Sequence, residues 1–319
     1  MFVLKYLKMM RTNGRKMDNL KKVMEAAVSA GIVVPAFNVA YLPMVKAITD
    51  TLTETNVYGM VEVSRIDFVK FGAKSIAAVA EEYKRVADPK LVSLHLDHIP
   101  VIDEDKLQVD WKSLIAEGIS CGYHSVMVDG SRLPLAENIR VVREVVQMAH
   151  PKGVLVEAEL GSVLGHESGP LPDYEKIFTR KIGFTKPEEA VRFVKETGVD
   201  WLSVSVGSIH GAISGLAKDQ PKVQAKIDIE YLKRLRDATG IPLVLHGGSG
   251  VQKSFVLEAF KNGIAKINVG TEIRQVYEKA LAESGNDIET GRKAINRAMK
   301  EIICATYQIE GSASRICQQ

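Results

Sequence analysis

The 319-residue sequence has few cysteines, no long apolar run and little excess charge. Its three cysteines, Cys121, Cys304 and Cys317, form no CxxC pair, which indicates a protein of the reducing cytoplasm without disulfides. No stretch reaches the roughly 18 consecutive apolar residues that a membrane-spanning helix needs. The net charge of +3 is too small to favour nucleic acid or a membrane surface. We therefore expect neither nucleic acid nor membrane among the partners.

The beginning of the chain differs in composition from the rest. The first 16 residues contain five basic residues and no acidic one, and lysines interrupt their apolar residues too often for a secretory signal. Residues 1–17 are therefore interpreted as an N-terminal extension. No short repeat, low-complexity tract or linker divides the remainder, so residues 18–319 are predicted to form one domain.

Short runs of branched apolar residues, which are typical of buried strands in a parallel sheet, recur along this domain. The eight predicted strands are Val33–Val39, Val57–Ser64, Leu91–His98, Ser125–Asp129, Val154–Leu160, Trp201–Val206, Pro242–His246 and Ala265–Val269. Eight such strands with crossover helices predict an α/β fold, the (β/α)8 TIM barrel. A doubly wound open sheet is the competing arrangement, but no GxGxxG turn follows the first strand.

Amphipathic stretches separate the predicted strands. The expected crossover helices are Leu42–Thr55, Ala73–Ala87, Trp111–Ser120, Pro134–Ala149, Pro187–Thr197, Ile229–Ala238 and Lys253–Asn262. An extra N-terminal helix, Asp18–Ala30, and the C-terminal helices Thr271–Glu283 and Thr290–Ala305 complete the prediction. Pro134 is expected in a first helical turn, and Asp228 and Thr271 are expected as N-caps.

Three histidines, His98, His210 and His246, end predicted strands. The strands of a (β/α)8 barrel all deliver their C-terminal ends to one rim, where active sites form. The three imidazoles are therefore expected to converge, and three imidazoles with one open position are typical of a catalytic zinc site. The alternative is that each is a hydrogen-bonded residue at a strand end.

Carboxylates accompany these histidines. Alternation along the third strand places His95 and Asp97 on one face, with His98 on the other unless the strand ends there. A carboxylate beside a metal ligand can act as a general acid or base, or can simply orient His98. Glu157 and Glu159 share a face of the fifth strand. The Gly- and Pro-rich segment that follows, Ser162–Lys176, contains His166 and Glu167 and is typical of an active-site loop.

Glycines follow the last two predicted strands, in the sequences HGGSG (residues 246–250) and NVGT (residues 268–271). Glycine lets backbone amides approach an anion closely, and Ser249 and Thr271 add hydroxyl donors. Because phosphate sites in such barrels recur after strands seven and eight, these segments predict a phosphate site.

Taken together, these motifs resemble class II, metal-dependent ketose-bisphosphate aldolases. The matching stretches are PAFNV, LHLDH, VMVDGSRLPLAENI, VEAELG, VGSIHG, LVLHGGSG and AKINVGTEI, in order over residues 20–300. The resemblance implies that His98, His210 and His246 bind one catalytic Zn²⁺. It implies that Asp97 exchanges a proton with the hydroxyl beside the bond that breaks, and that Glu167 moves a proton on the dihydroxyacetone phosphate side.

Further roles follow from the same resemblance. Asp129 and Glu159 would line an alternative metal position, and a monovalent cation, Na⁺ or K⁺, would bind beside the phosphate. The substrate and its phosphate would be bound by Asn38, Ser64, Gly211, Gly247, Ser249, Asn268, Gly270 and Thr271. The sequence departs from the family at Ile99, where glycine is usual, around Glu167, and at Ser214, where lysine is common. Gly270 leaves the acceptor aldehyde and its stereochemistry open.

The expected activity is reversible cleavage of a ketose 1,6-bisphosphate, fructose 1,6-bisphosphate or a stereoisomer, to dihydroxyacetone phosphate and an aldehyde such as glyceraldehyde 3-phosphate. The alternatives are another ketose 1-phosphate, Schiff-base chemistry at Lys266, or a non-catalytic barrel subunit. The expected partners are the phosphorylated ketose and further copies of the chain, in a homodimer or homotetramer. The expected location is the cytoplasm.

Overall fold

Eight parallel strands form a closed barrel in the computed structural model, which describes residues 19–163, 173–209 and 225–317. The strands pair in chain order, and the last pairs with the first. Their bounds are β1 Val34–Asn38, β2 Gly59–Ser64, β3 Val92–Pro100, β4 Ser125–Asp129, β5 Leu155–Leu160, β6 Trp201–Val204, β7 Leu243–Leu245 and β8 Ile264–Val269. The predicted (β/α)8 fold is thus confirmed.

The strands are almost completely buried, as expected when a parallel sheet is covered by helices outside and filled by its own side chains inside. Apolar residues face the helices, as Val61 and Leu94 do in β2 and β3, and both are fully buried. Several inward positions are instead polar, among them Glu62, His95 and Lys266, each with no exposed surface. A barrel interior with buried charges is where a functional site is to be sought.

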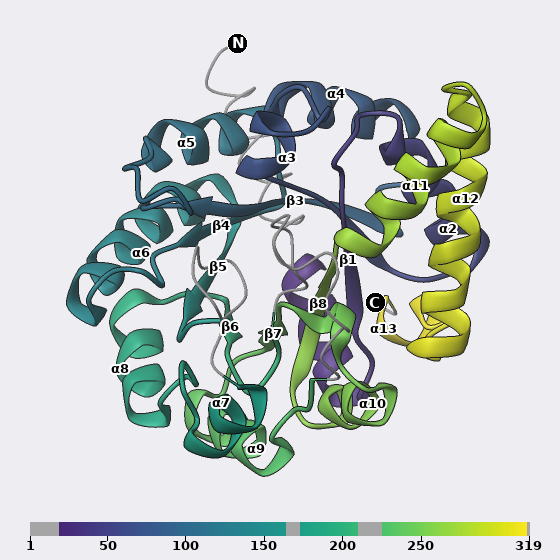
Figure 1. Ribbon diagram of the computed structural model, residues 1–319. Helices are drawn as coiled ribbons and strands as arrows, with labels where there is room; N and C mark the ends of the chain where they lie inside the picture. The colour runs from purple at the N-terminus through teal and green to yellow at the C-terminus, as the bar shows by residue number, and fades with distance from the viewer. Residues whose placement is uncertain (1–18, 164–172, 210–224, 318–319) are drawn as a thin grey trace.

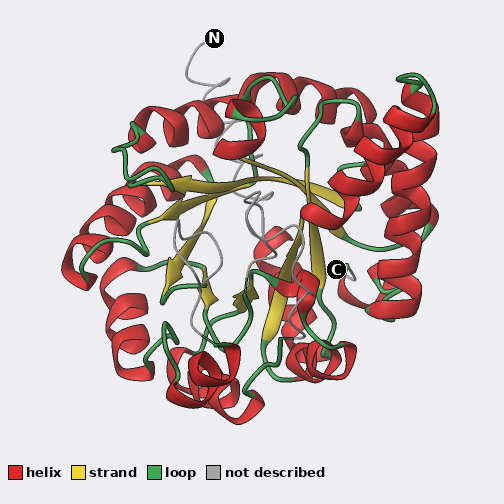
Figure 2. Cartoon of the chain, viewed as in Figure 1, coloured by secondary structure: helices red, strands yellow, loops and turns green. Residues whose placement is uncertain are grey.

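Helices surround the barrel (Figures 1 and 2). Those on the crossovers are α2 Met44–Glu54, α3 Arg65–Val69, α4 Ile76–Val86, α5 Trp111–Cys121, α6 Leu135–Ala149, α7 Tyr174–Arg180, α8 Pro187–Thr197, α9 Ile229–Thr239 and α10 Lys253–Lys261, with 3₁₀ turns η1 His150–Lys152 and η2 Gly248–Gly250. Residues 19–30 form the predicted N-terminal helix. At the other end are α11 Thr271–Glu283, α12 Ile288–Lys300, the π-helical turn η3 Glu301–Thr306 and α13 Ala313–Ile316. No helix in these ranges is long and apolar enough to cross a membrane.

The C-terminal helices pack on the outside of the barrel beside α2, as Figure 1 shows. Arg292 Nε of α12 donates to the Pro43 carbonyl at 3.1 Å, and Asn296 Nδ2 donates to Thr51 Oγ1 at 2.9 Å. Ile295 and Met299 of α12 are fully buried. These contacts hold α12 against α2, and α11, which begins at the barrel mouth, packs along α12.

Two local predictions were wrong in detail. Pro134 is the N-cap of α6 rather than a residue of its first turn, and Gly270, not Thr271, is the N-cap of α11. Asp228 is the predicted N-cap of α9, and its side chain accepts from Tyr231 N at 3.0 Å. The short helices α3 and α7 were not predicted, since five to seven residues are too few to show a helical period.

Candidate active site

A cavity of about 400 Å³ opens at the C-terminal ends of the strands. Residues from seven of the eight strands or the loops that directly follow them line it, as expected for the functional face of this fold. The predicted site residues that line it are Asn38, Ser64, Asp97, His98, Asp129, Glu159, His246, Gly247, Asn268, Gly270 and Thr271. Glu167, His210 and Gly211 lie outside the described residues, and Ser249 is part of the η2 turn.

An irregularity in β3 brings both Asp97 and His98 into this cavity. The pairing between β3 and β4 shifts between Leu96 and Ile99, and His98 has a φ of 31°. A residue in the left-handed region interrupts the alternation of side chains, so neighbours no longer point to opposite faces. The sequence pattern left His98 on the other face unless the strand ended. The strand instead continues to Pro100, and the bulge places both side chains in the cavity.

Two groups of possible metal ligands share His98. Ligand atoms of Asp97, His98 and His246 lie within 4.8 Å of one another, and so do those of His98, Asp129 and Glu159. The ring centroids of His98 and His246, from β3 and the end of β7, are 4.5 Å apart. Imidazole and carboxylate are ligands that zinc and similar divalent ions accept. The second group contains Asp129 and Glu159, the two residues for which an alternative metal position was expected.

Carboxylates make the surroundings of both histidines strongly negative. His246 Nδ1 is 3.1 Å from Glu159 Oε2, and its Nε2 is 3.0 Å from Glu157 Oε1. Burial opposes a charged imidazole at His246, but hydrogen bonds to these two glutamates prevail and raise its pKa to about 9. At His98, likewise, burial is outweighed by Asp97 and Asp129, and the pKa is well above its usual value. A pocket that attracts a proton this strongly also suits a divalent cation, so the donor set fits a metal ion.

Asp97 is fixed by two amide side chains. Asn268 Nδ2 donates to its Oδ1 at 2.9 Å, and Asn38 Nδ2 donates to its Oδ2 at 3.2 Å. Burial would raise the pKa of Asp97, but the positive charges of His98, Lys266 and His246 lower it to about 2. Asp97 is therefore ionised at neutral pH, oriented, and next to the possible metal ligands. An ionised, oriented carboxylate in this place can accept a proton from a bound hydroxyl.

A buried charge network lies beneath the site, and we define the interior network as Glu62, His95, Glu157 and Lys266. Lys266 Nζ is 3.0 Å from Glu157 Oε2 and 3.3 Å from Glu62 Oε2, and it donates to Asn268 Oδ1 at 2.6 Å. Burial would lower the pKa of Lys266, but these carboxylates raise it above its usual value. A protonated, triply engaged ammonium is a poor nucleophile, which argues against Schiff-base chemistry.

The two other members of the interior network are neutral at pH 7. Burial, with the nearby carboxylate of Asp97, raises the pKa of Glu62 to about 8. Burial, with the Lys266 ammonium, lowers the pKa of His95 to about 3, and His95 Nδ1 is 2.8 Å from Ser125 Oγ. Neither the role of Glu62 nor that of Lys266 was predicted. The available signal was a charged residue at an inward position of an otherwise apolar strand.

The predicted phosphate-binding segments lie together on one side of the cavity. Gly247 has a φ of 68°, in the left-handed region that glycine adopts without strain, and the turn Gly248–Gly250 follows directly. Gly270 lies so close to Asn38 that a Cβ atom there would be 2.9 Å from Asn38 Oδ1. Ser64 lines the cavity as well, and its Oγ donates to Asp67 Oδ2 at 2.7 Å in a capping box.

Comparisons with known proteins give one consistent result. The family described as class-II fructose-bisphosphate aldolase matches residues 18–315. The YdjI aldolase from Escherichia coli K12 is 26% identical, with a TM-score of 0.69 over 92% of this chain and 98% of that one. A protein assigned as a fructose-1,6-bisphosphate aldolase from Coccidioides immitis is 26% identical, with a TM-score of 0.72 over 92% and 96%. Fructose-bisphosphate aldolase from Campylobacter jejuni, at 19% identity, has the same fold, with a TM-score of 0.69 over 92% and 95%.

Proposed function

Because the chain belongs to the class-II fructose-bisphosphate aldolase family, we propose that it reversibly cleaves a ketose 1,6-bisphosphate, fructose 1,6-bisphosphate or a stereoisomer. The products are dihydroxyacetone phosphate and an aldehyde such as glyceraldehyde 3-phosphate. Membership of this family makes the protein an aldolase, which is a lyase. Family membership does not specify the substrate or its stereochemistry, and these are what we propose here.

The observation on which this proposal rests is Asp97, ionised between Asn38 and Asn268 and within 4.8 Å of His98 and His246. Cleavage begins when a base removes the proton from the hydroxyl on the carbon that becomes the aldehyde. Asp97 accepts that proton, the carbon–carbon bond breaks, and the electron pair passes to the dihydroxyacetone phosphate portion. The reverse reaction returns the same proton from Asp97.

The negative charge that cleavage leaves on the dihydroxyacetone phosphate portion needs stabilisation. A divalent metal ion supplies a Lewis acid there when bound. We propose Zn²⁺, with His98 and His246 as ligands and His210, from outside the described residues, as the third. A monovalent cation, Na⁺ or K⁺, beside the phosphate belongs to the same proposal. The support is the histidine and carboxylate donor set, which suits zinc, and the surplus of carboxylates around it.

The remaining interactions position the substrate. Gly247 and Gly248 expose backbone at the cavity wall for the phosphate of the dihydroxyacetone portion, and Thr271 adds a hydroxyl. Binding a non-reacting phosphate provides energy that orients the reacting carbons. Protonation of the carbon that becomes dihydroxyacetone phosphate is proposed for Glu167, also outside the described residues.

The test is cleavage of fructose and tagatose 1,6-bisphosphates by the purified protein, before and after EDTA and after zinc is added back. We expect activity that disappears with chelator and returns with zinc, and no inactivation by borohydride in the presence of substrate. The Asp97→Asn variant, assayed with the same metal content, is the matched control for the base. Chelator-resistant activity that borohydride traps would contradict the proposal and favour a Schiff base.

We also propose that the enzyme works in the cytoplasm as a homodimer or homotetramer. The free thiols of its three cysteines agree with a reducing compartment. Light scattering during size-exclusion chromatography will give the subunit count, and a mass near the 35.0 kDa of one chain would contradict this part of the proposal.

A further inference from the structure

The cavity wall next to Asp97 contains a positively charged side chain, Arg65, that no motif had indicated. Ser64 pairs with Asp97 across β2 and β3, and Arg65 follows Ser64 as the first residue of α3. Neighbouring strands are about 4.8 Å apart, so Ser64 lies directly beside Asp97, the proposed base. Arg65 is the next residue along the chain. Its side chain lines the cavity and is 26% exposed.

Both ends of this side chain are fixed. At the backbone, Ser64 N and Ser64 Oγ donate to Asp67 Oδ2 at 2.8 and 2.7 Å, and this capping box fixes the start of α3. At the guanidinium, Nη1 donates to Asp103 Oδ2 at 3.2 Å. Arg65 is therefore pre-organised, which reduces the entropy lost when it binds a ligand.

Asp103 is itself rigidly placed in the loop after β3. Its side chain is only 4% exposed, and its Oδ1 accepts from Asp105 N at 3.0 Å and from Leu107 N at 2.9 Å. Only Oδ2 is directed to Arg65. Since a guanidinium has five N–H donors and this contact uses one Nη1–H, donors remain for a ligand in the cavity.

The position of Arg65 matches one end of an extended substrate. In a closed barrel of eight strands in chain order, β2 and β3 lie across from β6 and β7. His98 and His246 reach from these two sides and meet with centroids 4.5 Å apart. A substrate whose phosphate lies at Gly247 and whose scissile bond lies at Asp97 therefore extends toward α3 and Arg65.

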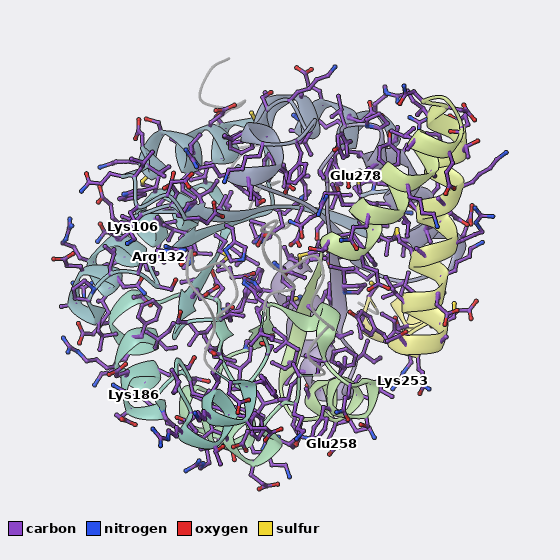
Figure 3. The ribbon with its side chains drawn as sticks, viewed as in Figure 1. Lys106, Arg132, Lys186, Lys253, Glu258 and Glu278 are labelled. Atoms are coloured by element: carbon purple, nitrogen blue, oxygen red, sulfur yellow. The ribbon has the colours of Figure 1, made fainter. Side chains whose placement is uncertain are left out.

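Three other Lys or Arg side chains line the cavity, namely Lys70, Arg132 and Arg274. Lys70 is 48% exposed and lies 3.4 Å from Glu104 and 3.8 Å from Asp105. Arg274 Nη1 donates to both carboxylate oxygens of Glu278, at 2.9 and 2.8 Å, on the α11 side. Figure 3 shows Glu278 and Arg132 on different sides of the barrel. Arg65 differs from them in that it follows the strand neighbour of Asp97 and donates to a buried carboxylate, Asp103.

We infer that Arg65 binds an anionic group at the far end of the aldehyde portion of the substrate, and that Asp103 acts as its positioning residue. The inference rests on the proposed function and adds the residue by which the enzyme distinguishes anionic from neutral aldehydes. The anion is a phosphate or a carboxylate, both of which a guanidinium binds through paired hydrogen bonds.

The experiment measures condensation of dihydroxyacetone phosphate with three aldehydes: glyceraldehyde 3-phosphate, succinic semialdehyde and neutral glyceraldehyde. The readout is the ratio of kcat/KM for each anionic aldehyde to that for glyceraldehyde. Wild-type enzyme is expected to favour at least one anionic aldehyde. Arg65→Gln should lower that ratio about 10- to 100-fold, the usual loss for a charge-assisted hydrogen bond. Arg65→Lys and Asp103→Asn should lower it less, because each retains a positive charge in the cavity.

Two controls separate this role from a structural one. Arg143→Gln removes an arginine that pairs with Glu196 outside the cavity at 3.3 Å, and should not change the ratio. Exchange of the dihydroxyacetone phosphate hydrogen with solvent deuterium reports the half-reaction that needs no aldehyde. If Arg65→Gln lowers exchange and turnover of all three aldehydes together, with an unchanged ratio, the inference is wrong.

The remaining outcomes are also decisive. A wild-type enzyme without preference for either anionic aldehyde overturns the inference while leaving the proposed function intact. If Arg65→Gln lowers the kcat/KM ratio only for glyceraldehyde 3-phosphate, Arg65 forms a phosphate site. If it lowers the ratio only for succinic semialdehyde, Arg65 forms a carboxylate site. If the metal-loaded wild type shows neither hydrogen exchange nor any condensation, the proposed function itself has failed.

Discussion

Replacement of Lys266 by methionine tests whether the interior network stabilises the barrel. The ammonium of Lys266 has no exposed surface and lies 3.0 Å from Glu157 and 3.3 Å from Glu62. Methionine has a similar length but no charge, so the variant fills the same space. Burial disfavours the charged form of Glu157, but Lys266 and His246 keep the pKa of this carboxyl below its usual value. The variant removes Lys266, which is the main counter-charge of Glu157.

The expected loss in the free energy of unfolding is large. Removing one partner of a buried ion pair typically costs about 3–5 kcal/mol, and here Glu157 remains buried with only His246 as a counter-charge. Asn268 also loses a donor to its Oδ1, and an unsatisfied buried acceptor adds about 1–3 kcal/mol. Because the two terms share one side chain they are not additive, and about 4 kcal/mol is the expected value at pH 7.

The assay is urea unfolding of metal-free protein, so that metal binding does not contribute to stability. Far-UV circular dichroism follows the fold, and fluorescence follows the two tryptophans, Trp111 and Trp201, of which Trp201 donates its Nε1–H to Glu157 Oε2 at 2.7 Å. Lys186→Met is the control, since Lys186 pairs with Glu189 at the surface and lies on the outside in Figure 3. It should leave the stability close to that of the wild type, as surface substitutions usually do. A loss below about 1 kcal/mol for Lys266→Met would refute the reasoning.

Four further predictions concern single residues. Asp97→Asn should retain bound metal, measured by mass spectrometry, but lose about 10²–10⁴-fold in kcat for cleavage, the usual contribution of a positioned base. His246→Ala should lose stoichiometric metal, because it removes a ligand candidate and leaves Glu157 and Glu159 without their shared imidazole. Glu62→Gln should change the pH dependence of stability: the folded-state pKa is raised to about 8, so wild-type stability falls as pH rises from 4.5 through 8. The variant should lose this fall, at most about 1.4 kcal/mol per pH unit, in urea titrations at pH 5.5, 7 and 8.5. Gly270→Asp should lower kcat for both bisphosphates, since a Cβ would meet Asn38 Oδ1 at 2.9 Å and displace an amide that donates to Asp97; an unchanged kcat would show that Asn38 adapts.

Much of the barrel could be predicted from the sequence because each strand and helix has its own local pattern. The runs around Val61, Leu94 and Val156 are apolar on the face that packs against helices, and all three residues are buried. Element ends were predicted less well, since they depend on contacts made elsewhere. The sixth strand ends at Val204, two residues before its predicted end.

The candidate site was predictable where a cavity-lining polar residue follows an apolar run, as His98 and His246 do. The bulge that places His98 beside Asp97 was not, since it appears only in the pairing of β3 with β4. Arg65 could not be found for a similar reason. Its place in the cavity depends on a hydrogen bond to Asp103, which is 38 residues away in sequence, and on the strand register that places Ser64 beside Asp97.

The interior network connects the two halves of the proposed chemistry through one ammonium group. Lys266 donates to Asn268, and Asn268 donates to Asp97, the proposed base. Lys266 also lies against Glu157, whose other oxygen is 3.0 Å from His246, a ligand candidate. Both chains of contact are buried, so solvent screening does not weaken them. Lys266 is therefore linked to the proposed base and to a candidate metal ligand at once, which gives a reason for an expensive buried charge in the middle of β8.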